Sequence, residues 1–123
     1  MNEITLGEIE SRFADMIWDK EPVGTAELVR LCAESFGWKR TTTYTVLKRL
    51  CEKGLFMTEN GVVSARISRD EFYSRQSLKI VNDSFGGSLP AFIAAFAAGK
   101  PLSDREISEI REMIDKFGKG DGK

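Results

Sequence analysis

The stretch Trp38–Leu55, WKRTTTYTVLKRLCEKGL, predicts an amphipathic helix with two different faces. An α-helix turns by about 100° per residue, so residues three and four apart share a side. Small and apolar residues gather on or beside one face: Thr43, Val46, Leu47, Leu50, Cys51 and Gly54. The other face collects hydroxyls and charges: Thr41, Thr42, Thr45, Lys48, Arg49 and Glu52. The helix is therefore expected to bury one face in a core and to expose the other.

The exposed face has the chemistry of a DNA-recognition helix. Hydroxyls and cations bind phosphate oxygens and base edges. We expect the threonines and Tyr44 to lie nearest the bases and phosphates of a major groove, and the cations to contact mainly phosphates. Tyr44 has an alternative role in covering the first turn of the helix, and Arg49 in a surface ion pair near Glu52. The DNA-binding candidates are Lys39, Arg40, Thr41, Thr42, Tyr44, Thr45, Lys48 and Arg49.

Charge is distributed unevenly along the chain, although the formal net charge is only −1. Residues 1–37 hold three bases against eight acids. Residues 38–53 hold five bases, and Glu52 is their single acid. Because the local field decides how a nucleic acid docks, this basic segment favours DNA binding despite the acidic total.

Composition excludes several classes of protein. With 123 residues, 41% hydrophobic and 30% charged, the sequence is typical of a soluble globular protein of one or two small domains. No apolar run approaches the roughly 18 residues of a spanning helix, and the acidic N-terminus is unlike a signal peptide. The two cysteines are expected to be buried thiols in a reducing cytoplasm. Without histidine, a phosphate-binding glycine loop or paired carboxylates, we expect no enzyme activity, metal or cofactor.

The residues on either side of the stretch complete a known order of elements. Two amphipathic helices are expected before it, to about Asp19 and from Thr25 to about Ser35. After Gly54, short β-patterned runs over 55–58 and 62–67 flank Glu59-Asn60-Gly61, and Asn-Gly between such runs is a strong hairpin signal. Three helices followed by a hairpin predict a winged helix-turn-helix DNA-binding domain over residues 1–68.

Residues 69–117 predict a three-helix arm, and residues 118–123 a flexible tail. Thr5, Ser68 and Ser103 each precede a glutamate by three positions, which is the pattern of a helix-capping box. The middle helix, residues 89–98, carries no charge on any side and must be covered everywhere. A two-fold dimer covers it most simply. The expected interface residues are Phe72, Leu78, Val81, Phe85, Leu89, Phe92, Ile93, Phe96, Ile107, Ile110 and Ile114.

The chain resembles the penicillinase-repressor family from Ile4 to Phe117. The resemblance is carried by Trp38 followed by Thr42-x-x-Thr45-x-Leu47-x-Arg49-Leu50, then by Lys53-Gly54, Phe85-Gly-Gly-Ser88 and Leu102-Ser-x-x-Glu106-Ile107. It implies a mainly α bacterial protein with a small β-hairpin: a winged helix-turn-helix domain and a C-terminal dimerisation arm. It also implies a homodimer that represses transcription from a palindromic operator.

The resemblance further implies a route of induction. Family members in antibiotic-resistance operons are released when the middle arm helix is cut before a phenylalanine, after a membrane sensor detects a β-lactam. The corresponding position here is Ala95-Phe96, whereas those repressors have asparagine before the phenylalanine. A sensor protease or another inducer is the implied partner. The wing tip, Glu59-Asn60-Gly61, carries no cation, which favours the alternative reading of a winged-helix protein-interaction module.

Overall fold

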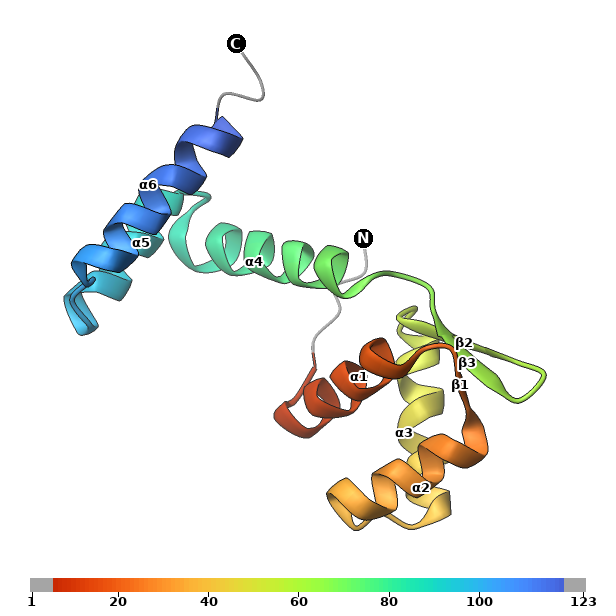
Figure 1. The fold of residues 1–123 in the computed structure, drawn as a ribbon. Helices are drawn as coiled ribbons and strands as arrows, with labels where there is room; N and C mark the ends of the chain where they lie inside the picture. The colour runs from red at the N-terminus through yellow and green to blue at the C-terminus, as the bar shows by residue number, and fades with distance from the viewer. Residues whose placement is uncertain (1–5, 119–123) are drawn as a thin grey trace. The chain divides into compact units, whose positions relative to one another are not determined.

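The computed structural model describes residues 6–118, which form two compact units that divide between Lys79 and Ile80 (Figure 1). The tail expected at 118–123 lies outside the described residues except for Gly118. The structure is mainly helical with one small antiparallel sheet, as predicted.

The first unit has the element order of a winged helix-turn-helix domain. Its elements are α1 (Glu8–Lys20), β1 (Val23–Gly24), α2 (Thr25–Phe36), α3 (Arg40–Glu52), β2 (Phe56–Glu59), β3 (Val62–Ala65) and the first part of α4 (Arg69–Phe85). The strand order is β1-β3-β2, and both pairings are antiparallel. Asn60 and Gly61 both have positive φ, 54° and 74°, which is the backbone that a tight two-residue hairpin turn requires. The predicted hairpin is confirmed, but the sequence pattern gave no sign of β1.

The core of the first unit joins all three of its complete helices to the sheet. Its fully buried side chains include Phe13, Ile17, Leu28, Leu50, Leu55, Phe56 and Val63. Trp38 packs against Phe13 and Phe36 at ring-centroid distances of 5.3 and 4.8 Å, so it stabilises the core.

Helix ends follow the predicted capping chemistry in the second half of the chain. The Ser68 and Ser103 hydroxyls accept hydrogen bonds from the backbone N–H groups of Glu71 and Glu106, both at 3.0 Å. The first helix differs, since α1 begins at Glu8 with Gly7 at the N-cap. The glutamate that returns to the cap is Glu10, whose Oε1 accepts from Gly7 N at 3.2 Å. Thr5, expected in this role, lies outside the described residues.

The second unit holds the end of α4, α5 (Leu89–Gly99) and α6 (Asp104–Gly118). Gly86 and Gly87, with φ of 58° and 84°, end α4 in a conformation that disfavours other residues. No residue of α5 or α6 is buried in the described chain. Large apolar side chains are instead exposed: Ile80, Leu89, Phe96, Met113, Ile114 and Phe117. Within residues 6–118, no single helix is both long and apolar enough to cross a membrane.

Candidate nucleic-acid interface

Helix α3 presents the two faces that its sequence predicts. Thr43, Val46, Leu47 and Leu50 are buried. Every predicted DNA-binding residue is exposed: Lys39, Arg40, Thr41, Thr42, Tyr44, Thr45, Lys48 and Arg49. The left-handed backbone of Gly37, φ 69°, ends α2 and allows the chain to turn into α3 within three residues. The predicted residues therefore lie on one helix or at its N-cap and are accessible together.

The start of α3 concentrates positive potential. Lys39 occupies the N-cap position and Arg40 the first helical position, and no acidic residue stands in the first turn. The N-terminus of a helix is itself the positive end of the helix dipole, so cations there disfavour the helix. An anion bound at this end would relieve the repulsion. Such a local conflict is typical of a functional surface.

The threonine hydroxyls on α3 are partly committed by the helix itself. Thr45 Oγ1 donates to the carbonyl oxygen of Thr41 at 2.8 Å. Its hydrogen is therefore used, and the oxygen remains available to accept from a donor such as the amino group of cytosine or adenine. Thr41 and Thr42, one turn earlier, are exposed on the same helix.

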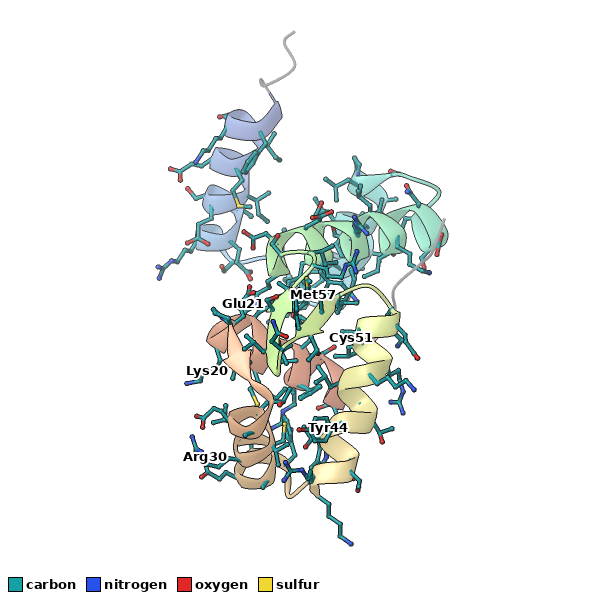
Figure 2. The ribbon with its side chains drawn as sticks, turned by 90° about the vertical axis from the view of Figure 1, so that its right-hand side faces the viewer. Lys20, Glu21, Arg30, Tyr44, Cys51 and Met57 are labelled. Atoms are coloured by element: carbon teal, nitrogen blue, oxygen red, sulfur yellow. The ribbon has the colours of Figure 1, made fainter. Side chains whose placement is uncertain are left out.

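Tyr44 connects α3 to the beginning of α2. Its side chain is 38% exposed, and the Arg40 guanidinium lies 5.8 Å from the ring centroid. The pKa of Tyr44 is lowered, first by a hydrogen bond with Thr25 and also by Arg40. Tyr44 and Cys51 lie along the same side of α3 (Figure 2). They line a shallow hollow of about 320 Å³ with Thr25, Leu47, Lys48 and Thr58.

Arg49 is held by α1. Its Nη1 donates to Glu10 Oε2 at 2.9 Å, and Lys53 Nζ lies 3.5 Å from Glu10 Oε1. The sequence suggested an ion pair near Glu52, but the partner comes from a residue 39 positions earlier. The Arg49 side chain remains 50% exposed, while Glu10 is only 13% exposed. Glu10 therefore holds the far end of α3 against α1. It also uses one of the hydrogen-bond donors of the Arg49 guanidinium.

Replacing Glu10 with glutamine is expected to lower the free energy of unfolding at neutral pH but not in acid. The hydrogen bond from Arg49 is the main cause that lowers the pKa of the Glu10 carboxyl. A lowered folded-state pKa stabilises the protein above the ordinary carboxyl pKa, and this contribution disappears as the pH falls through the folded value. At pH 7 the variant should lose roughly 1 kcal/mol or less, because its cationic partners are partly exposed.

Urea unfolding of wild type, Glu10→Gln and the control Glu8→Gln, at pH 7 and in acid, measures this effect. The wild-type advantage over Glu10→Gln should shrink as the pH falls. An advantage that stays constant down to pH 3 would mean that the carboxylate charge is irrelevant.

The predicted arm residues are placed in two different environments. Phe72 is 1% exposed and belongs to the core of the first unit, where its ring lies 5.5 Å from Trp18. A side chain already covered by its own chain has no surface left for a partner. The other predicted interface residues are half-buried or exposed: Leu78, Val81, Phe85, Leu89, Phe92, Ile93, Phe96, Ile107, Ile110 and Ile114. Ala95 and Phe96 lie inside α5, so a cut between them would require local unwinding.

Within the part of the chain that the structure describes, no three His, Cys, Asp or Glu side chains are grouped to hold an ion. Burial raises the pKa of the Cys32 thiol, which favours its neutral form.

Comparison with known proteins identifies the family. A model of the penicillinase repressor family matches residues 6–116. The chain is 25% identical over 121 residues to a penicillinase repressor of Staphylococcus aureus, covering 95% of this chain and 94% of the relative. It is 21% identical over 115 residues to the methicillin resistance regulatory protein MecI of Staphylococcus aureus, covering 90% of this chain and 94% of that protein. With its winged helix-turn-helix unit and helical second unit, the chain belongs to the penicillinase repressor family, whose members are transcriptional repressors and not enzymes.

Proposed function

We propose that the protein is a homodimeric repressor that occupies a palindromic DNA operator through the major groove. The observation that carries this proposal is the exposed surface of α3, on which hydroxyls and cations stand together over a buried apolar face. In helix-turn-helix proteins the second helix of the pair enters the major groove, and here that helix is α3.

The residues of α3 divide into two roles. Lys39, Arg40 and Lys48 bind phosphates, because flexible exposed cations near a positive helix end suit a polyanion. Thr41, Thr42 and Thr45 lie nearest the base edges, where short side chains allow close approach. Tyr44 borders the hollow beside Lys48 and contacts the DNA backbone. Arg49 contributes less than its charge suggests, because Glu10 already binds it.

The second unit supplies the dimer interface. Its helices expose Leu89 and Phe96 on α5 and Ile114 and Phe117 on α6, with exposed fractions of 49 to 70%. Apolar surface of this extent is rare on a monomer and marks an interface. A second copy offers the same surface, and a two-fold arrangement buries both at once.

Repression follows from occupancy. A dimer that binds two half-sites gains affinity. Once one winged-helix unit is bound, the local concentration of the other at its half-site is raised. When the operator overlaps a promoter, the bound dimer blocks transcription from that promoter. Any event that separates the protomers, including a cut in α5, releases the DNA.

Selection from a random double-stranded DNA pool tests the proposal. The protein should enrich one inverted repeat, and footprinting should protect two half-sites on one face of the duplex. Enrichment of no sequence, or of a single unrepeated site, would contradict the dimeric operator model.

The wing supports a second candidate function, a contact with another protein. Its tip carries Glu59 and no cation, and Met57 and Val62 are 38% and 41% exposed. This surface disfavours phosphate and could hold an apolar partner.

Replacing Glu59 with lysine is expected to raise DNA affinity by about threefold to tenfold at low salt, because one repulsive charge becomes attractive. The gain should vanish at high salt. Fluorescence anisotropy with the selected operator measures it. Glu8→Lys makes the same change in charge at an exposed position of α1 and is the matched control. If Glu59→Lys leaves DNA affinity unchanged, the wing tip lies away from the duplex and the protein-contact function gains support.

A further inference from the structure

We propose that Glu10 competes with DNA for Arg49 and thereby keeps the last turn of α3 from binding phosphate. Operator affinity is then set by a carboxylate of α1 as well as by the cations of α3. The inference rests on the proposed function, since it concerns how strongly the same helix holds an operator. All of its contacts lie within the first compact unit, which ends at Lys79.

Arg49 belongs to the stripe of α3 that carries the threonines proposed to lie near the base edges. Thr41, Thr45 and Arg49 follow one another at intervals of four residues, so their side chains leave the helix on one side. The Arg49 side chain is 50% exposed. An exposed guanidinium in line with these hydroxyls is able to donate to a DNA phosphate or to a guanine edge. Its place on the helix therefore suits DNA contact, and only its partner on α1 opposes it.

Both oxygens of the Glu10 carboxylate are engaged. Oε2 accepts from Arg49 Nη1 at 2.9 Å. Oε1 accepts from the backbone N–H of Gly7 at 3.2 Å and lies 3.5 Å from Lys53 Nζ. The Glu10 side chain is only 13% exposed, and the hydrogen bond from Arg49 is the main cause that lowers its pKa. The carboxylate is thus held in place from several sides and stays ionised at neutral pH.

The ion pair presents a weaker field to a phosphate than a lone arginine does. With 2.9 Å between the bonded atoms of Glu10 and Arg49, the two charges largely cancel at the distance of an approaching duplex. The helix adds to this effect. Arg49 lies in the last turn of α3, where the helix dipole is negative, whereas Lys39 and Arg40 stand at its positive start. The attraction for DNA is therefore graded along α3, and Glu10 weakens it most at the C-terminal end.

The test measures how Glu10→Gln binds the inverted repeat selected from random DNA, over a series of salt concentrations. Glutamine keeps the shape of the side chain, removes its charge and releases Arg49 in both protomers. Operator affinity should rise by about tenfold at low salt. The slope of the logarithm of the association constant against the logarithm of salt concentration should become steeper by roughly two, because two more phosphates are neutralised. Fluorescence anisotropy measures both quantities.

Two controls separate the ion pair from a general change in charge. Glu8→Gln removes the same charge from an exposed position of α1. It should bind within about threefold of wild type and keep the wild-type slope, because an exposed charge outside the ion pair is screened by salt. The double variant Glu10→Gln/Arg49→Gln lacks the guanidinium that the first substitution releases. In this protein the gains in affinity and in slope should both disappear.

Glu10→Ala is a second neutral variant in case glutamine is poorly tolerated, because alanine is the strongest helix former. Circular dichroism establishes that the variant used is folded. If a folded neutral variant matches Glu8→Gln in both affinity and slope, the inference is overturned. A gain in affinity that survives in Glu10→Gln/Arg49→Gln would overturn it as well, since Arg49 would then play no part. Failure to select any inverted repeat would instead overturn the proposed function, so the two failures are distinct.

Discussion

Ile114→Asp is expected to convert the proposed dimer into a monomer and to lower operator affinity by about 100-fold or more, the advantage that two linked DNA-binding units provide. Ile114 is 56% exposed on α6, so the substitution leaves the fold of the single chain intact. In a dimer the same position is covered, and an unpaired carboxylate buried in an apolar interface is strongly destabilising.

Sedimentation velocity and operator titration measure the two parts of this result. Arg111→Asp is the control, because it places an aspartate at an exposed position of the same helix with an even larger change in charge. It should remain dimeric. If Ile114→Asp sediments as a dimer at micromolar concentration, the interface does not include this face of α6.

Lys48→Glu is expected to abolish specific binding near physiological salt, with a loss of about 100-fold or more. A dimer carries the substitution twice, and each copy both removes a phosphate contact and adds a repulsive charge. Lys48 is exposed on α3 and lines the hollow with Tyr44 and Thr58, so the change should spare the core.

Arg30→Glu makes the same change in charge on α2 (Figure 2). There Arg30 pairs with Glu27 and Glu34. It should bind the operator within about threefold of wild type, because remote surface charges are screened. Equal losses for both variants would mean that net charge alone determines binding and that α3 has no special role.

The sequence predicted those features that local patterns encode. The two faces of α3 follow from residue spacing, and the hairpin turn from Asn60-Gly61, because each depends on residues close together in the chain. β1 escaped prediction because it has only two residues, Val23 and Gly24, and exists only by pairing with Val62 and Val63. No periodicity can appear in two residues.

The remaining differences come from contacts that span the chain. Phe72 fits an apolar stripe on α4, but the pattern does not say whether a partner copy or Trp18 covers that stripe. Arg49 faces Glu10 only because α1 crosses the end of α3. Both are tertiary effects between residues far apart in sequence. They change the site itself. Arg49 is bound to Glu10 as well as being a candidate for DNA contact, and Phe72 no longer belongs to the proposed dimer interface.

The dependence of operator affinity on salt tests the central claim most directly. If Lys39, Arg40 and Lys48 of two protomers neutralise about six phosphates, the logarithm of the association constant should fall against the logarithm of salt concentration with a slope of roughly −5. At physiological salt the selected repeat should bind at least about 1,000-fold more tightly than a scrambled duplex. A slope near zero, or equal affinity for the repeat and the scrambled duplex, would contradict a repressor that reads its operator through α3.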